Sequence, residues 1–529
     1  MINKKVQVWL PLLFSITMIF GMFLGYKMRD NMPGKNFFFK DKRKPVQEVM
    51  DLISTKYVDE VKTDELADTA IQAILGKLDP HSVFIPAEQL QQLNEDLAGK
   101  FFGIGIEFNI FDDTLHVINV VEGGPGEKAG LLTGDKFLQV GDSSLTGKRM
   151  SSEQYRKLLR GERGTDVSIV YLRQGRQQKV TLTRDAIPLS SIDASYMMGN
   201  GIGYIRLNKF STQTYREFMQ KLEGLKKTGL QKLVLDLRGN GGGILDEAVE
   251  IADEFLDGDK LITYTEGKHF PKKEYRCRRE GQFEKGPLVV LADEGTASAS
   301  EVLIGALQDW DRAIVIGRRT FGKGLVQEQF DLSDNSALRL TIARYYTPVG
   351  RSIQRPYTRG EKAYYEEITN RYFDGETQTA DSVKNDTSKI YKTKAGKKVF
   401  GGGGITPDHF VSLDTNSYNR HQSSFFAKST IPQFVFRFYL QYRETLNGYK
   451  TIADFINRFS LTETQWQQFV ISAATDSVNL GNILPSEKTF LINNIKANIA
   501  RQLWHTEGLF EVLNATDDCI KRSLQVLGN

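Results

Sequence analysis

Residues 288–301 of the chain read LVVLADEGTASASE, an apolar run followed by small and polar residues, and an apolar helical pattern comes next. Short runs that are apolar throughout are typical of buried strands. Similar runs lie at 202–207, 232–237 and 313–316, with helical spacing between them. This alternation predicts an α/β core with some parallel pairing. We expect the core to span residues 185–411, with a polar, tyrosine-rich excursion on its surface at 360–400.

Ser298 lies where the strand at 288–291 gives way to the helix. Its neighbours are small, so a substrate can approach closely, and the unpaired N–H groups of a helix start can stabilise an oxyanion. The spacing of Ser298 and Glu301 also fits a helix capping box. Taken alone, this segment favours the capping interpretation over the catalytic one.

Two further strand ends are rich in glycine. Residues 236–243 read DLRGNGGG and residues 317–324 read GRRTFGKG. Loops that follow the strands of one α/β core gather at one edge, where such folds bind ligands. The second loop is similar to a phosphate-binding loop. However, Gly324 replaces the hydroxyl residue that would hold magnesium, and residues 325–330 alternate like a strand, so nucleotide binding is disfavoured.

Five motifs resemble, in order, those of the C-terminal processing peptidases, which are tail-specific serine proteases. They are LDPHS (78–82), DLRGNGG (236–242), TASASE (296–301), TFGKG (320–324, followed by Val326 and Gln327) and GGITPD (403–408). The resemblance covers residues 45–410. It implies that Ser298 is the nucleophile, Lys323 the general base and Gln327 the residue that orients the lysine. It also implies an oxyanion hole made by Ala299 N–H and a glycine N–H near Gly242.

Two positions bear on this assignment. Gly241 stands where the family usually has proline, which leaves the exact oxyanion glycine open. Gln327 lies four residues after Lys323, a distance of about 13 Å along an extended strand, so it reaches Lys323 only if the chain bends. A lysine base must be neutral, which requires a pKa well below the usual value of about 10.4. We therefore expect Lys323 in an apolar, partly closed site, and we expect no cofactor.

Residues 101–184 change to short β-type runs, separated by glycine-rich turns, with one helix near 151–160. This pattern predicts a compact β domain, and the segment resembles a PDZ domain. The resemblance implies that Gly103, Ile104, Gly105 and Ile106 form the carboxylate-binding loop, where a peptide tail adds a strand to a sheet edge. The alternative is a purely structural module.

The chain ends are predicted to be helical. Lys4 and Lys5 precede an uncharged run at 8–24, which favours an uncleaved signal anchor over residues 1–26. A basic linker at 27–44 and a small helical unit at 45–100 follow. By the positive-inside rule, the basic linker would place the part of the chain after the anchor in the cytoplasm. However, a large domain that follows a signal can cross the membrane regardless of charge, so we expect export. The region 412–529 reads as helical, with three open roles: dimerisation, adaptor docking or capping of the core.

Composition excludes several classes of function. The net charge of +4 over 529 residues and the absence of a basic stripe give no case for nucleic acid. Cys277 and Cys519 form no disulfide framework. The six histidines have no metal-ligand spacing, so no metal site is expected. Together with the resemblance above, the sequence predicts a multidomain α/β serine endopeptidase of the cell envelope, anchored in the inner membrane with its catalytic part in the periplasm and acting on proteins with exposed C-termini. The alternative is a non-catalytic peptide-binding scaffold.

Overall fold

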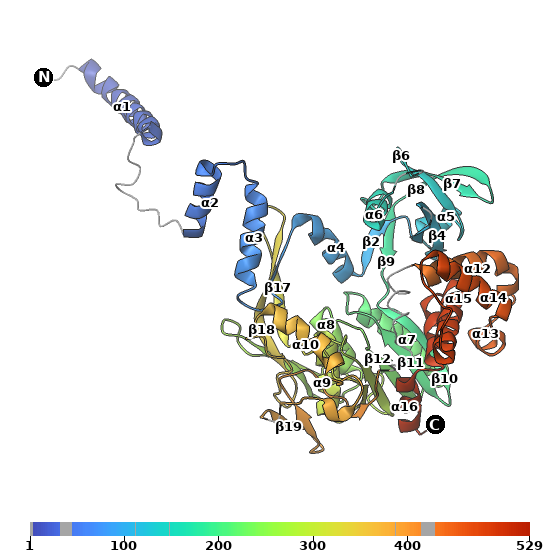
Figure 1. The fold of residues 1–529 in the computed structure, drawn as a ribbon. Helices are drawn as coiled ribbons and strands as arrows, with labels where there is room; N and C mark the ends of the chain where they lie inside the picture. The colour runs from blue at the N-terminus through green and yellow to red at the C-terminus, as the bar shows by residue number, and fades with distance from the viewer. Residues whose placement is uncertain are drawn as a thin grey trace. The chain divides into compact units, whose positions relative to one another are not determined.

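The computed structural model describes residues 4–31, 45–111, 113–145, 147, 149–386, 388–413 and 429–528 (Figure 1). The chain divides into two compact units, Met1–Ala73 and Ile74–Asn529. The first unit contains α1 (Lys4–Asn31), α2 (Pro45–Lys56) and most of α3 (Thr63–Leu75). Within α1, Trp9–Lys27 is long and apolar enough to cross a membrane, a test that a signal sequence also passes. Helix α1 takes in residues 27–31 of the expected linker, and the remainder of that linker lies outside the described residues.

The second unit is built on a six-stranded sheet with the order β10-β11-β12-β15-β16-β21. Strands β10 and β11 are antiparallel, and every other neighbouring pair is parallel. This confirms the predicted α/β core with parallel pairing. The strands are β10 (Ile192–Gly199), β11 (Ile202–Leu207), β12 (Lys232–Asp236), β15 (Leu288–Ala292), β16 (Ile314–Gly317) and β21 (His409–Phe410).

Both faces of this sheet are covered. One face packs against α7 (Thr214–Lys227), α8 (Leu245–Asp253) and α9 (Ala299–Asp309), and every residue of α9 is buried. The other face packs against α16 (Asp518–Val526). Strands covered on both faces are near-continuous apolar runs, which explains why the sequence runs do not alternate.

A second, antiparallel sheet has the order β1-β18-β13-β14, with β17 also paired to β18. Its first strand comes from the segment expected as a purely helical unit at 45–100. Because β1 pairs with β18, residues from Ile74 onward belong to the second compact unit. The elements are β1 (Val83–Ile85), α4 (Ala87–Ala98), β13 (Leu261–Glu266), β14 (Lys273–Arg276), β17 (Leu325–Asp331) and β18 (Ala337–Tyr346).

The segment 360–400 is more than a surface excursion. It forms α10 (Glu361–Phe373), a short 3₁₀ turn (Ala380–Ser382) and the hairpin β19 (Ile390–Lys392) and β20 (Lys398–Phe400). Tyr364 and Arg371 of α10 are buried. Arg371 donates to the carbonyl of Thr320 at 2.8 Å, which ties α10 to the loop that carries Lys323.

The β domain has the strand order β3-β4-β5-β7-β8, with β6 beside β5, and β3 at one edge. Its own core includes Ile104, Val117, Phe137, Tyr155 and Ile169. The predicted β domain with one main helix is therefore present. The strand pair β2 (Lys100–Gly103) and β9 (Asp185–Pro188) joins this domain to the rest of the unit. The elements of the domain are β3 (Ile106–Phe111), β4 (Thr114–Val120), α5 (Pro125–Lys128), β5 (Lys136–Val140), β6 (Ser143–Ser144), α6 (Ser152–Leu159), β7 (Asp166–Arg173) and β8 (Arg176–Thr183).

The C-terminal region is helical over residues 429–528, as predicted, while residues 414–428 lie outside the described residues. Helices α12 (Thr430–Leu446), α13 (Ile452–Arg458), α14 (Glu463–Thr475) and α15 (Pro485–Asn514) enclose a separate aromatic-rich core. Helix α15 contacts β10 of the large sheet. Phe436 of α12 packs against Phe111 and His116 of the β domain. The C-terminal helices therefore contact both other parts of the second unit.

Candidate active site

The three predicted loops follow β12, β15 and β16, which are adjacent parallel strands of the large sheet. The carboxyl ends of such strands meet at one edge, so the loops come together there. Ser298 follows β15, Gly242 follows β12, and Lys323 follows β16. The last of these loops leads into β17 rather than into a helix, which agrees with the interpretation against a phosphate-binding loop.

Ser298 is the N-cap residue of α9, with φ 59° and ψ −118°. N-cap residues normally have an extended backbone that points the side chain at the helix start. Positive φ is costly for a residue with a side chain and is found where surrounding structure imposes it, often at functional sites. The Ser298 side chain makes no capping hydrogen bond, whereas its backbone N–H donates to Glu301 at 2.9 Å. Glu301 therefore accepts the hydrogen bond expected in a capping box, whereas the backbone conformation of Ser298 differs from that of an ordinary N-cap residue.

Glu301 connects the serine loop to the lysine loop. Its buried carboxylate accepts from the N–H groups of Ser298 (2.9 Å), Gly322 (2.8 Å) and Lys323 (2.9 Å). The hydroxyl of Thr320 donates to the same carboxylate. Burial raises the pKa of Glu301, and these hydrogen bonds oppose that rise. One side chain therefore fixes the backbone of Ser298 and Lys323 side by side.

Tyr345 of β18 reinforces this pairing from the other side. Its hydroxyl lies 3.0 Å from the carbonyl oxygen of Ser298 and within hydrogen-bond distance of the carbonyl oxygen of Lys323. The side chain is buried. The nucleophile and base positions therefore share two hydrogen-bonding partners, one for their N–H groups and one for their carbonyl groups.

The Lys323 side chain is mostly enclosed. Nζ donates to Gln327 Oε1 at 2.9 Å. Burial lowers the pKa of Lys323, the charge of Arg339 lowers it further, and Glu301 and Asp79 act in the opposite direction. The surroundings of Lys323 therefore favour its neutral form, which a general base requires.

The glycine loop lies directly against the serine. Gly242 has φ 96°, and a Cβ added there would lie 2.8 Å from Ser298 Cβ and 2.9 Å from Ala299 N. The loop is held in place because Asn240 O accepts from Ala297 N–H at 3.0 Å and from Ser300 Oγ at 2.9 Å. In this conformation Gly242 N–H donates to Asn240 Oδ1 at 2.9 Å, so it is directed at its own loop rather than outward.

A fourth segment reaches the site from far away in the sequence. His81, in the segment LDPHS, offers its carbonyl oxygen to Gln327 Nε2, and its Nε2 lies 2.8 Å from the Tyr364 hydroxyl. Burial and the charge of Lys323 lower the pKa of His81 to about 4, which leaves the ring neutral at neutral pH. The segment is held by Asp79, whose carboxylate accepts from the N–H groups of His81 and Ser82.

The sequence signals for these supporting residues are weak. Glu301 was visible only as half of a capping box, and His81 only as part of a motif flanking the core. Tyr345 and Tyr364 carried no sequence signal of their own. Each acts through contacts made by folding, so only the three-dimensional structure relates it to the site.

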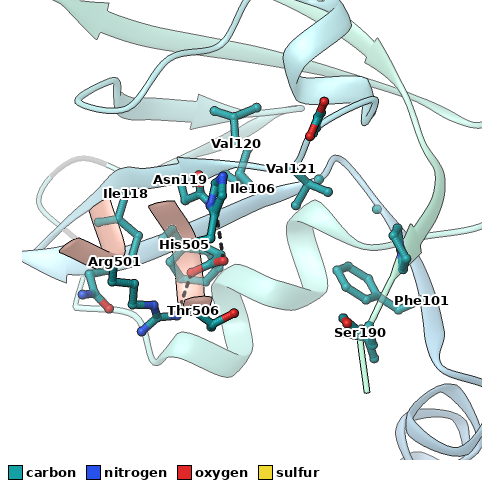
Figure 2. Close-up of a pocket in the computed structure, with 18 of the residues that line it drawn as sticks. Phe101, Ile106, Ile118, Asn119, Val120, Val121, Ser190, Arg501, His505 and Thr506 are labelled. Carbon is teal, nitrogen blue, oxygen red and sulfur yellow. Dashed lines mark hydrogen bonds and ion pairs between the residues drawn. The ribbon is translucent and has the colours of Figure 1, made fainter. Parts of the chain in front are cut away.

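The four residues of the predicted peptide-binding loop lie in the β domain, where β2 ends at Gly103 and β3 begins at Ile106. Ile104 is buried, and Gly105 has φ 72°, a conformation that favours glycine. All four line a cavity of about 930 Å³ (Figure 2). Ser298, Lys323 and Gln327 are not among the residues that line it, so the predicted peptide-binding and catalytic residues form two separate sites.

Metal ligands do not cluster in the part of the chain that the structure describes: no group of three or more His, Cys, Asp or Glu residues is arranged to hold an ion. Cys277 and Cys519 are both buried as free thiols. Burial raises the pKa of the Cys277 thiol to about 12 and that of Cys519 to about 11. Neither thiol is therefore poised to act as a nucleophile.

Comparison with known families divides the chain in the same way. Residues 201–360 match peptidase family S41, and residues 116–173 match the PDZ domain. Residues 27–89 match the N-terminal domain of the activating protease CtpB. Residues 423–505 match a family of unknown function.

The chain is also similar to individual carboxy-terminal processing and CtpA-like proteases. The carboxyl-terminal-processing protease of Synechocystis sp. is 36% identical over 313 residues, which are 58% of this chain and 72% of that protein. The carboxy-terminal processing protease CtpA of Bacillus subtilis is 32% identical over 355 residues, 65% of this chain and 75% of that protein. A probable CtpA-like serine protease of Staphylococcus saprophyticus is 34% identical over 319 residues, which are 60% of this chain. The match covers 64% of that protein, so the chain spans less than two thirds of its length. The chain belongs to the carboxy-terminal processing proteases of peptidase family S41.

Proposed function

We propose that the chain is an active serine endopeptidase that cleaves proteins at or near their C-terminal tails, outside the cytoplasm, with a Ser298–Lys323 dyad. One observation carries the proposal: Glu301 and Tyr345 hold the backbones of Ser298 and Lys323 together, while burial lowers the pKa of the lysine. A purely structural site has no need of an enclosed lysine beside a serine with an unfavourable backbone conformation.

The reaction follows from these positions. Neutral Lys323 accepts the proton of Ser298 as Oγ attacks the carbonyl carbon of the scissile bond, giving a tetrahedral oxyanion. The lysine ammonium then donates that proton to the departing amine, leaving an acyl-enzyme. A water molecule, deprotonated by Lys323, attacks the ester, and the returning proton regenerates Ser298. Gln327 orients Lys323 through its Oε1 and is itself held by the carbonyl of His81.

The oxyanion is stabilised by the N–H groups of Ala299 and Gly242. For Gly242 to take part, its N–H must leave Asn240 Oδ1 and turn toward the substrate oxygen. Glycines at 241, 242 and 243 allow this rotation at little steric cost. Gly242 N–H would thus exchange its hydrogen bond to Asn240 for one to the substrate oxygen as negative charge develops on that oxygen.

Substrate selection belongs to the PDZ-like domain. The edge strand β3 and the loop at Gly103–Ile106 offer a free strand edge and backbone N–H groups to the carboxylate of a tail. Helix α1 would hold the protein at a membrane as a signal anchor, with the remainder of the chain exported.

The test compares the full-length protein in detergent with its Ser298→Ala and Lys323→Ala variants. An unfolded substrate protein with an apolar C-terminus is digested, and its fragments are followed by mass spectrometry. Cleavage by the parent protein alone is expected. If all three bind the substrate equally and none cleaves it, the non-catalytic scaffold replaces the protease. If Lys323→Ala cleaves as fast as the parent, lysine is not the base.

A further inference from the structure

The large cavity is lined by three parts of the second unit that are remote in sequence (Figure 2). Residues around β10 and β11, among them Asp193 and Lys209, line it between two larger walls. One wall is the PDZ-like domain, including the loop at Gly103–Ile106, strand β3 and part of α6. The facing wall comes from helices α12 and α15 of the C-terminal region, which includes Val435, Phe436, Arg501 and His505. At about 930 Å³ the cavity is at the upper end of the range of about 300–1,000 Å³ typical of ligand sites.

The faces of β3 differ in what they contact. Ile106, Phe108 and Ile110 pack against the core of the PDZ-like domain. Because side chains alternate along a strand, Glu107 and Asn109 face the other way. Glu107 lies opposite Asn119 of β4 in the register and accepts a hydrogen bond from its side chain at 3.2 Å. The apolar face of β3 therefore points at the domain's own core, and a polar face points away from it.

The C-terminal helix α15 covers this polar face. Arg501 donates to Glu107 at 3.0 Å, and His505 Nδ1 lies 3.3 Å from Asn119 Nδ2 (Figure 2). Helix α15 is interrupted at Trp504 and His505, where His505 has φ 53°. The Arg501–Glu107 pair keeps 41% and 44% of its side-chain surface exposed, so both groups remain accessible from the cavity.

Arg501 is the guanidinium group that α15 contributes to this wall. Arg501, Asn498, Gln502, His505 and Thr506 of α15 all line the cavity. The carboxylate of Glu107 is already held by Arg501 and Asn119. A guanidinium group carries five N–H donors, so Arg501 can bind Glu107 and a second carboxylate together. The wall therefore suits an acidic side chain better than a basic one.

We propose that the C-terminal domain is the second half of the peptide site and that Arg501 selects acidic side chains at alternate positions of the bound tail. A tail added to β3 points its last side chain, and the one two residues earlier, toward the groove lined by Ile106 and Leu159. The side chains one and three residues before the terminus then point toward Glu107 and α15. The favoured ligand has an apolar last residue and Glu or Asp at those two positions. This inference rests on tail capture as proposed above.

The test measures binding without cleavage, using the full-length Ser298→Ala protein in detergent. The probes are fluorescein-labelled peptides that end in leucine and differ only at the two positions, with Glu, Ala or Lys at both. Fluorescence anisotropy should show the Glu peptide binding about fivefold more tightly than the Lys peptide, as expected for partly exposed charge pairs. Arg501→Glu should abolish or reverse this preference. Arg458→Glu, on the same domain but outside the cavity lining, should leave it unchanged.

A fourth peptide, the Glu peptide with an amidated C-terminus, separates the two proposals. If the amide binds as tightly as the acid, tail capture itself is wrong. If the acid binds more tightly but Glu and Lys peptides bind equally, or Arg501→Glu keeps the preference for Glu, tail capture stands and the role of α15 is refuted. Circular dichroism of each variant establishes that a lost preference does not reflect loss of the fold.

Discussion

Lys323 Nζ donates to Gln327 Oε1 at 2.9 Å, although the two residues are four positions apart at the start of an extended segment. The contact is possible because β17 begins only at Leu325 and its pairing with β18 shifts register between Val326 and Gln327. An irregularity of this kind bends the strand and redirects a side chain. The strand therefore contains the bend that Gln327 needs to reach Lys323. As a result, the Gln327 side chain lies between Lys323 and the carbonyl oxygen of His81.

Replacing Gln327 with Glu should move the pH profile of peptide cleavage. A carboxylate at this position favours the charged form of Lys323 and so raises its pKa, and the base becomes neutral only at higher pH. We expect the rising limb of kcat/KM to shift upward by about one pH unit or more. Gln327→Leu removes the contact without adding a charge, so it should lower the rate without an upward shift. Equal profiles for the Glu variant and the parent protein would exclude Lys323 as the titrating base.

Replacing Gly242 with Ala should strongly slow cleavage. The new methyl group would lie 2.7 Å from Ala297 O and 2.8 Å from Ser298 Cβ, and φ 96° is unfavourable for alanine. We expect a loss of about a hundredfold or more in kcat, the size associated with one oxyanion donor. Gly241→Ala is the matched control, because a Cβ at Gly241 meets nothing within 4 Å. Comparable loss in both variants would mean that general loop flexibility, and not the contact with Ser298, is what matters.

Glu301→Gln should weaken both the fold and the activity. The glutamine amide presents an NH₂ group to backbone N–H donors that now meet a carboxylate, and at least one buried donor then lacks an acceptor. We expect the free energy of unfolding to fall by about 1–3 kcal/mol. Activity should fall further than stability explains, because Ser298 and Lys323 lose their common partner. Glu328→Gln, on the exposed side of β17, controls for the loss of a negative charge. Chemical denaturation and peptide cleavage, measured on the same samples, test this.

The sequence predicted the parts of the site that depend on local pattern. Apolar runs identified the strands, and parallel strands place their carboxyl ends together, so Gly242, Ser298 and Lys323 could be expected at one edge. The position of residues 103–106 before an edge strand could be expected from local pattern in the same way, whereas their role in peptide binding is implied by the resemblance to a PDZ domain and stays a prediction.

The remaining features depend on the path of the folded chain. Gln327 and His81 are 246 residues apart, and no periodicity relates them. The hydrogen bond from Gly242 N–H to Asn240 is local, yet its direction depends on how Ala297 and Ser300 hold the loop. The polar composition of the segment 360–400 predicts a surface excursion. Its buried Tyr364 nevertheless contacts His81, which a composition average cannot reveal.

The stability of the protein in acid should depend on His81. Its folded-state pKa of about 4 is lowered by burial and by the charge of Lys323, compared with 6.5 for an unperturbed histidine. Between these two values the unfolded chain binds a proton that the folded protein does not, so stability falls as pH decreases from about 6.5 to about 4. His81→Gln removes this titration, and its melting temperature should fall less over that interval than that of the parent. His269→Gln, at an exposed position, serves as the control. Parallel curves for His81→Gln and the parent would show that His81 is protonated as readily in the folded protein as in the unfolded chain.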